Sequence, residues 1–316
     1  MKLLFFGSPA VAVPFLEACV RGGHEVPFVV TQPDRPAGRG LGLKPPPVKA
    51  AAQRLGLRVL QPEKLSAIRE EVAACGADAA VVVAYGRFFG PKFLASTRLG
   101  FLNVHFSLLP KYRGAAPVQW TLIRGDKRAG VTLFWIVKEM DAGPVQRRAA
   151  LDVGADEDAP ALFKRLIDLG ARELAAALAD ISAGRVRREK QEDAVTLAPK
   201  LTEKEARLDF GLSAPEMHNR VRGLRGGPRA FLMLNMPGRS APLRLTVLRT
   251  TPDEDGGDGV PGTIVRVADE KGILIQCSAG RCWIAEVQPE GKKPLKAVDF
   301  LNGIRLQQGD LLSAAA

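Results

Sequence analysis

Cysteine and histidine are scarce in this chain of 316 residues. The four cysteines include no C-x-x-C pair, and the three histidines lie far apart in the sequence, so neither a disulfide framework nor a Cys/His metal site is predicted. We therefore expect reduced, buried thiols and no bound metal. No apolar run reaches the roughly 18 residues that a membrane span requires. The first residues lack a signal cleavage site and predict a buried strand, which favours a cytoplasmic protein.

Two nucleotide-binding signatures are also missing. The first apolar run is followed by Gly7-Ser8-Pro9-Ala10-Val11-Ala12, where a dinucleotide-binding fold has G-x-G-x-x-G. The P-loop motif G-x-x-x-x-G-K-[ST] does not occur. These absences argue against a dehydrogenase and against a P-loop ATPase, so we expect a different ligand at the carboxyl ends of the strands.

Acidic residues are absent from one long stretch, Met217 to Pro252, which carries seven arginines, among them Arg220, Arg222 and Arg225. The whole chain has a net charge of +11. A solvated surface is the ordinary explanation of an arginine-rich run. A stretch of this length without one carboxylate nevertheless creates a strong positive field, and it indicates a polyanionic partner.

The first half of the chain alternates apolar runs with helical patterns, which is typical of a mostly parallel sheet between helices. The predicted strands are 2–6, 25–31, 79–84, 101–105 and 131–137, and the predicted helices are 9–21, 48–55, 64–75 and 114–124. Apolar residues at helical spacing predict a further long helix over 158–181.

The texture of the sequence changes after Gly184. A highly charged stretch, 185–193, is typical of an exposed linker. Short β-rich runs at 243–249, 262–267, 272–277 and 282–287 follow, separated by Asp/Gly/Pro turns. They favour a small β-barrel of the OB type. We predict an α/β domain over 1–189, a linker over 190–207 and an OB-like domain over 208–316.

Three polar residues form the best candidate site. Asn103 and His105 are two positions apart at the end of a predicted strand, so their side chains share one face. An amide beside an imidazole can stabilise an oxyanion, and the imidazole can carry a proton near neutral pH. Asp141 follows the next predicted strand and is expected at a neighbouring strand end. Each residue alone has a bland explanation, but the three together predict a catalytic site.

The run from Asn103 to Pro117, with Asp141 after it, resembles the formyltetrahydrofolate-dependent formyltransferases. The stretch Thr31 to Gly40 resembles those members of the family that act on charged initiator tRNA. The resemblance extends over essentially the whole chain, including Ala84-Tyr85-Gly86 and Lys200 to Arg207. It implies a Rossmann-like formyltransferase domain, a linker and an OB-like C-terminal domain.

The resemblance also implies substrates and site residues. The donor would be 10-formyltetrahydrofolate, and the acceptor would be the amino group of initiator methionyl-tRNA. We expect the enzyme to be a monomer. Asn103, His105 and Asp141 match the family's catalytic positions. Folate binding is expected along two segments, Val83, Ala84, Tyr85 and Gly86, and Ser107, Leu108, Leu109 and Pro110. Contacts with tRNA are expected at Arg35, Arg39, Lys44, Arg220, Arg222 and Arg225.

The loop Pro33 to Pro47 is rich in proline and glycine, and it is predicted to be neither a helix nor a central strand. It is either a loop that contacts tRNA or a flexible connector.

Two residues depart from the commonest pattern of the family. Phe106 stands where the family usually has a small residue or proline, and Pro144 stands where an acidic residue is frequent. We expect the Phe106 ring to narrow the pocket.

Three alternative functions are open. A purine-pathway formyltransferase would share the chemistry but would not need the C-terminal extension. A sugar-nucleotide formyltransferase typically has arginine between the glycine and the Ala-Pro, whereas Gly114-Ala115-Ala116-Pro117 is intact here. A non-catalytic RNA-binding protein would account for the basic stretch but would leave the Asn103, His105 and Asp141 set idle.

Overall fold

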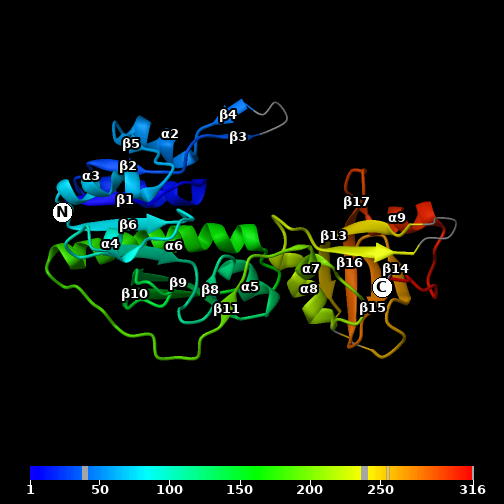
Figure 1. The fold of residues 1–316 in the computed structure, drawn as a ribbon. Coiled ribbons are helices and arrows are strands. Elements are labelled where there is room, and N and C mark those ends of the chain that lie inside the picture. The colour runs from blue at the N-terminus through cyan, green and yellow to red at the C-terminus, as the bar shows by residue number, and fades with distance from the viewer. Residues whose placement is uncertain (38–41, 236–240, 254, 256, 315–316) are drawn as a thin grey trace. The chain divides into compact units, whose positions relative to one another are not determined.

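The computed structural model describes residues 1–37, 42–235, 241–253, 255 and 257–314 (Figure 1). The chain forms two compact units, and each is described by itself. The first unit comprises Met1–Gly114, Ala129–Leu151 and Lys164–Leu197, and the second comprises Ala115–Arg128, Asp152–Phe163 and Ala198–Ala316. The sequence predicts two continuous domains, 1–189 and 208–316, joined by one linker. Each structural unit instead consists of three separate stretches of the chain. The boundaries of the functional domains stay a prediction.

A seven-stranded sheet forms the centre of the first unit. Its strands lie in the order β10 (Val145–Asp152), β9 (Arg128–Trp135), β7 (Phe101–His105), β6 (Ala79–Val83), β1 (Leu3–Gly7), β2 (Phe28–Val30), β5 (Arg58–Leu60). From β5 to β7 all neighbours are parallel, and β9 is antiparallel to β7. Buried apolar residues, many of them β-branched or aromatic, fill the inner strands because both faces of the sheet are covered, whereas the edge strands β5 and β10 are largely half-buried. The expected mostly parallel sheet is confirmed.

Helices of the first unit cover the sheet, and all of them except the short α4 fall where the helical patterns predict them. They are α1 (Val13–Arg21), α2 (Pro47–Arg54), α3 (Arg69–Ala74), α4 (Pro91–Leu94) and most of α6 (Ala159–Ser182), with short 3-10 turns at Ala10–Ala12 and Leu65–Ile68. Helix α6 approaches its neighbours closely at Gly170, where a Cβ would lie 3.0 Å from the ring of Phe15. Glycine at this position therefore permits the close packing.

The loop predicted over 33–47 contains a small hairpin of two strands, β3 (Arg35–Ala37) and β4 (Gly42–Lys44). In its register Arg35 faces Lys44. The two arms pair only with each other and lie outside the central sheet, so they are neither a helix nor a central strand, as expected. At the base, the Asp34 carboxylate accepts hydrogen bonds from Lys49 and Gln61, and these bonds lower its pKa.

The second unit is built on an antiparallel sheet with the order β12 (Phe231–Leu234), β13 (Leu243–Pro252), β16 (Arg281–Pro289), β15 (Gly272–Gln276), β14 (Ile264–Ala268); β17 (Leu295–Lys296) pairs with β16. Its helices are α5 (Pro117–Ile123), α7 (Glu203–Ala206), α8 (Ala214–Gly223) and α9 (Ala297–Ile304). The expected antiparallel β domain after the α/β domain is confirmed. Helix α5 packs on α8, where a Cβ at Gly223 would lie 2.9 Å from Ile123.

All four cysteines are unpaired, as the sequence predicts. Burial raises the pKa of the Cys19 thiol to about 12 and that of Cys277 to about 11. Thiols with such high pKa values stay protonated at neutral pH and are poor nucleophiles. Among the described residues, none of the helices combines the length and apolar character that crossing a membrane requires.

Candidate active site

Strand β7 places Asn103 and His105 on one face near its carboxyl end. The His105 side chain is buried and Asn103 is half-buried. In the described part of the chain, no hydrogen bond is found to the Asn103 amide, so its donor hydrogens are available to a ligand. The predicted sharing of one face therefore brings a free amide beside an imidazole.

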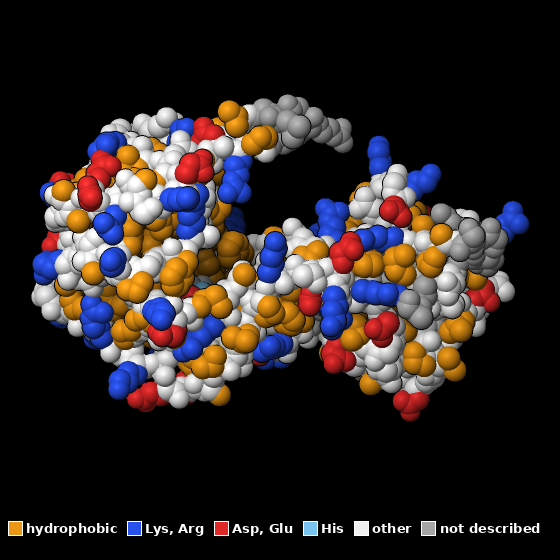
Figure 2. Space-filling model, viewed as in Figure 1, with side chains coloured by type: hydrophobic (Ala, Val, Ile, Leu, Met, Phe, Trp, Pro, Cys, Tyr) orange, Lys and Arg blue, Asp and Glu red, His pale blue; other side chains and the backbone are white. Residues whose placement is uncertain are grey.

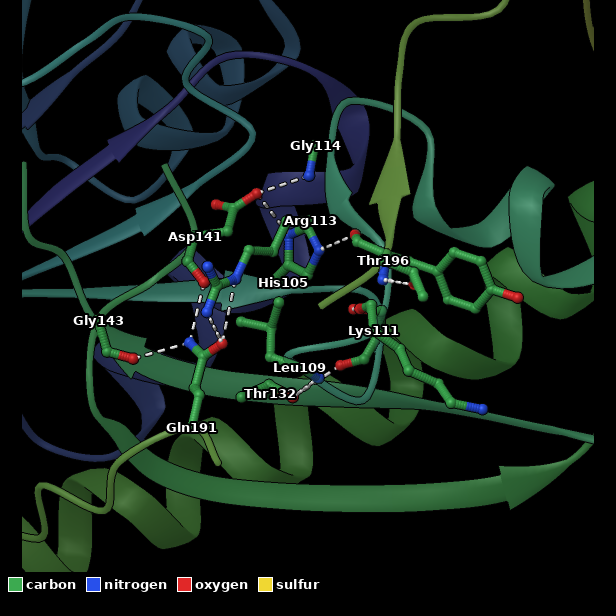
Figure 3. A network of polar contacts seen from close by, with 12 residues as sticks. His105, Leu109, Lys111, Arg113, Gly114, Thr132, Asp141, Gly143, Gln191 and Thr196 are labelled. Carbon is green, nitrogen blue, oxygen red and sulfur yellow. Dashed lines mark hydrogen bonds and ion pairs between the residues drawn. The ribbon is translucent and has the colours of Figure 1, made fainter. Parts of the chain in front are cut away.

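The orientation of the His105 ring is set by a backbone carbonyl. Its Nε2 lies 2.9 Å from the carbonyl oxygen of Tyr112, so Nε2 carries a hydrogen and donates it (Figure 3). Tyr112 has φ of 63°, a left-handed conformation that is costly for a non-glycine residue, and its N–H donates to Oγ1 of Thr196. Nδ1 is therefore the ring nitrogen left for chemistry.

The Asp141 carboxylate faces Nδ1 of His105. Its Oδ2 is 3.8 Å from Nδ1 of His105 and accepts a hydrogen bond of 2.8 Å from the N–H of Gly114 (Figure 3). The carboxylate is largely shielded, with 15% of the side chain exposed. Asp141 also has a left-handed backbone, with φ of 51°. Because strained non-glycine residues cluster at functional sites, this conformation supports a role for the carboxylate.

The prediction that Asp141 lies at a strand end next to that of His105 is wrong. Strand β9 runs antiparallel to β7, and its end pairs with the start of β7, Trp135 facing Leu102. The carboxyl ends of the two strands therefore lie at opposite edges of the sheet. Asp141 reaches His105 through the loop between β9 and β10, which turns back at Gly143 so tightly that a Cβ there would lie 1.7 Å from the Trp135 oxygen.

The turn after β7 is fixed by Thr132 of β9. Its hydroxyl donates to the Ser107 carbonyl at 2.7 Å and accepts from the Leu109 N–H at 3.0 Å. The Ser107 hydroxyl donates to the Lys111 carbonyl. Ser107, Leu109 and Pro110 are buried, and Leu108 is half-buried. These hydrogen bonds fix the backbone of the predicted folate segment, and its side chains mostly face the interior.

The second predicted folate segment follows β6. Val83 and Tyr85 are buried in the core, whereas Ala84 and Gly86 are exposed. Ala84 has φ of 47° and Gly86 has φ of 76°. Gln32 donates to the Tyr85 carbonyl at 3.0 Å and fixes the turn. Small residues at the two exposed positions leave the backbone open to close approach by a ligand.

The basic residues predicted to contact tRNA have different surroundings. Arg35, Lys44 and Arg225 are exposed, and Arg220 is half-exposed. Arg39 lies outside the described residues. Arg222 is only 6% exposed, and it donates to the Gly154 and Glu157 carbonyls and to Asn219, so the expected surface contact at Arg222 is not supported. Figure 2 shows Lys and Arg side chains over the visible face of both units.

The two departures from the family pattern have local explanations. The Phe106 ring is buried and meets Phe15 edge-on, with ring centroids 6.0 Å apart, so it packs in the core instead of narrowing a pocket. Pro144 has no N–H to offer, but its carbonyl accepts a hydrogen bond from the Trp135 N–H. A proline is therefore compatible with this end of the β9–β10 loop.

Three residues of the site escape sequence reasoning. Tyr112 and Gly114 contribute backbone groups, which no side-chain pattern reveals, although both belong to the motif that carries the resemblance. Gln191, whose side-chain amide donates hydrogen bonds to the carbonyls of Asp141 and Gly143, belongs to the charged stretch predicted as a linker, and no signal marks it. Within the described ranges, His, Cys, Asp and Glu side chains form no group of three that could hold a metal ion.

Comparisons with known proteins identify the family of this chain. Residues 1–178 match the family model described as formyl transferase, and residues 200–305 match its C-terminal domain. The methionyl-tRNA formyltransferase of Solibacter usitatus is 41% identical, with 99% of this chain and 98% of the relative covered. That of Elusimicrobium minutum is 40% identical, with 99% of each covered.

Solved structures share the fold at low identity. An N-formyltransferase from Helicobacter canadensis, in complex with folinic acid and dTDP-3-aminofucose, has a TM-score of 0.66 at 16% identity and covers 90% of this chain and 98% of its own. HypX from Aquifex aeolicus, in complex with tetrahydrofolic acid, has a TM-score of 0.62 at 16% identity, over 99% of this chain and 50% of its own. Because the full-length relatives are about 40% identical over nearly the whole of both chains, the chain belongs to the methionyl-tRNA formyltransferase family.

Proposed function

We propose that this enzyme transfers the formyl group of 10-formyltetrahydrofolate to the α-amino group of initiator methionyl-tRNA. The observation that carries the proposal is the arrangement around one nitrogen: Nδ1 of His105 lies 3.8 Å from the Asp141 carboxylate, and Asn103 lies two residues before His105 on the same face of β7. Full-length similarity to methionyl-tRNA formyltransferases supports the choice of acceptor.

The reaction follows from the groups at this nitrogen. The neutral amine attacks the formyl carbon, a C–N bond forms, and the carbonyl π electrons move onto oxygen. The Asn103 amide and a protonated Nδ1 of His105 stabilise this oxyanion, while Asp141 stabilises the positive ring. The oxyanion then collapses, the bond to N10 of the folate breaks, and the proton lost by the amine passes to N10, directly or through water, with help from Asp141.

The donor fits the backbone segments beside the site. Ala84 and Gly86 expose backbone groups at a turn that Gln32 fixes, and a flat ring can approach them without meeting large side chains. The side chains of Val83, Tyr85, Leu109 and Pro110 are buried, so we infer that these residues bind folate through their backbone or by shaping the wall. One structural neighbour carries tetrahydrofolic acid, which supports a folate donor.

The acceptor tRNA is assigned to exposed basic residues. Arg35 and Lys44 lie opposite each other on the β3–β4 hairpin, and Arg39 belongs to the segment between its strands. Arg220 and Arg225 of the arginine-rich stretch add positive charge in the second unit. Together with the net charge of +11, these residues favour a polyanion. A cytoplasmic, monomeric enzyme remains our expectation.

A sugar-nucleotide formyltransferase is the second candidate, because one neighbour of similar fold binds a dTDP-amino sugar. One assay separates the candidates: purified protein, labelled 10-formyltetrahydrofolate, and as acceptors charged initiator tRNA, charged elongator tRNA and a nucleotide amino sugar. We expect label only on initiator methionyl-tRNA. Label on the sugar would overturn the proposal, and RNA binding without transfer would favour a non-catalytic protein.

A further inference from the structure

The segment after helix α6 is held against the sheet of the first unit. Glu189 exchanges two backbone hydrogen bonds with Val145 of β10, of 2.7 and 3.0 Å. The Arg187 carbonyl accepts a hydrogen bond from the Trp135 indole, and Gln146 bonds the backbone of Arg185 and Arg187. Most side chains of this stretch are exposed, as predicted for a linker, but its backbone is fixed.

Gln191 connects the end of this segment to the candidate site. Its Nε2 donates to the carbonyl oxygens of Asp141, at 2.9 Å, and Gly143, at 2.8 Å. Its Oε1 accepts from Nε and Nη2 of Arg113, at 3.2 and 2.7 Å (Figure 3). A primary amide has two donor hydrogens and two lone pairs on oxygen, so Gln191 uses its full hydrogen-bonding capacity here.

The two hydrogen bonds that Gln191 donates, to Asp141 and Gly143, constrain a strained part of the backbone. Asp141 has φ of 51°, a left-handed conformation that is unfavourable for a non-glycine residue and persists only where the surroundings impose it. The Gln191 amide fixes the backbone carbonyls on both sides of Ala142. The Asp141 side chain is then directed to the Gly114 N–H and to His105.

We propose that Gln191 is a positioning residue for formyl transfer, which acts by holding the Asp141 carboxylate in reach of His105. The inference rests on the proposed function of Asp141. Gln191 touches no reacting atom, and its effect on the rate passes through the 141–143 backbone. The simpler alternative is that Gln191 only fastens the segment after α6 to the sheet.

A matched control is available in the same segment. Gln146 is also a glutamine, and its amide also fixes this stretch, through the Arg185 carbonyl and the Arg187 N–H, but among the described residues its side chain makes no hydrogen bond to the 141–143 loop. A fastening role predicts that Gln191→Leu and Gln146→Leu have similar effects. A positioning role predicts that only the Gln191 variant loses turnover.

The test measures kcat and KM for both substrates in wild type, Gln191→Leu, Gln191→Glu, Gln146→Leu, Asp141→Asn and the double variant Gln191→Leu/Asp141→Asn. We expect Gln191→Leu to lower kcat about 10–100-fold with nearly unchanged KM, because small displacements of a catalytic group have effects of this size. Gln191→Glu keeps an acceptor for Arg113 and loses both donors, so it should be similarly slow. Gln146→Leu should retain kcat, although its melting temperature falls.

The double variant decides how Gln191 acts. If Gln191 acts through Asp141, adding Gln191→Leu to Asp141→Asn should change kcat less than 3-fold, since residues that form one unit are not additive. Fully multiplicative losses, or equal losses in the two glutamine variants, would overturn the inference. If Gln191→Leu does not fold, Gln191→Glu in the same two backgrounds gives the same comparison.

Failure of the underlying function has a different signature. Wild-type protein without formyl transfer to methionyl-tRNA would contradict the proposed function and the inference with it. Wild-type activity that survives Asp141→Asn unchanged would remove the role of Asp141 through which Gln191 is proposed to act. Active wild type, slow Asp141→Asn and normal Gln191 variants would contradict the Gln191 inference alone.

Discussion

Nδ1 of His105 and Oδ2 of Asp141 lie 3.8 Å apart, too far for a direct hydrogen bond and close enough for an ion pair once the ring is protonated. The Gly114 N–H holds the carboxylate at this distance, and the Tyr112 carbonyl occupies the other ring nitrogen. The separation leaves Nδ1 without a direct hydrogen bond to the carboxylate.

Asp141→Asn should lower kcat by about 10²–10⁴-fold, because the amide keeps an acceptor for Gly114 but cannot stabilise a positive ring or take up a proton. Steady-state kinetics with charged initiator tRNA measure the effect, and a melting curve reports folding. The exposed Asp193→Asn is the control and should behave as wild type. Wild-type kcat in Asp141→Asn would reduce Asp141 to a turn residue.

Asn103→Ala should lower kcat by about 10²–10³-fold with little change in KM, the size expected for one lost oxyanion donor. The side chain has no other hydrogen-bond partner among the described residues, so stability should change little. The exposed Asn302→Ala serves as the control. A rise in KM at constant kcat would instead indicate a binding role for Asn103.

Arg39→Ala should reduce kcat/KM for charged initiator tRNA and leave the affinity for the folate donor unchanged. Arg39→Lys keeps the charge and loses the planar guanidinium. If the contact is to a base edge, Lys should fail to restore activity, and initiator tRNA should lose more than elongator tRNA carrying methionine. Equal losses and a salt slope reduced by about one unit would indicate a phosphate contact. Unchanged kinetics in both variants would make the 33–47 loop a connector.

Arg222 and Arg225 should separate stability from tRNA binding. Because Arg225 is exposed, Arg225→Ala should weaken tRNA binding and lower the salt slope of that binding by about one unit. The same guanidinium also lies 3.3 Å from the Asp158 carboxylate. Arg222→Met leaves buried carbonyls without their charged donor, and it should lower the free energy of unfolding by about 2–4 kcal/mol. Filter binding and urea denaturation measure the two effects. Selective loss of tRNA affinity in Arg222→Met would restore Arg222 to the binding surface.

Stability should fall as the pH is lowered from about 7 to about 5. Burial lowers the pKa of His218, and this effect outweighs the opposing influence of the Ala155 and Thr250 carbonyls and of Asp156, 3.5 Å from Nε2. The unfolded chain therefore binds a proton that the folded chain resists, and the stabilisation present above the unfolded pKa is lost on acidification. His218→Gln should flatten this part of the curve in urea denaturation at several pH values. An unchanged slope would assign the effect to other groups, such as His24, whose pKa burial also lowers.

Local patterns predict the main elements because each carries its own signal. The long helix over 158–181 and the strand over 101–105 are confirmed as α6 and β7, since helical periodicity and a bounded apolar run are properties of single segments. The sharing of a face by Asn103 and His105 follows from the two-residue period of a strand. Side chains on one element are therefore within reach of sequence reasoning.

Relations between elements were harder to foresee. No residue signals that β9 runs antiparallel to β7, so the path of Asp141 to His105 could not be read from the sequence. The burial of Arg222 depends on carbonyls that lie more than 60 positions away in the chain. Gln191 is an ordinary polar residue in a charged stretch, and only its partners distinguish it.

The way the chain is divided between the two units limits how this enzyme can be recombined with its relatives. Residues 115–128 and 152–163 belong to the same unit as 198–316, and helix α6 passes from one unit to the other between Phe163 and Lys164. Joining residues 1–190 of this chain to the C-terminal half of a relative would pair its α5 with a foreign α8. Such chimaeras should be insoluble unless all three pieces of the second unit are exchanged together, because that unit is discontinuous in the sequence.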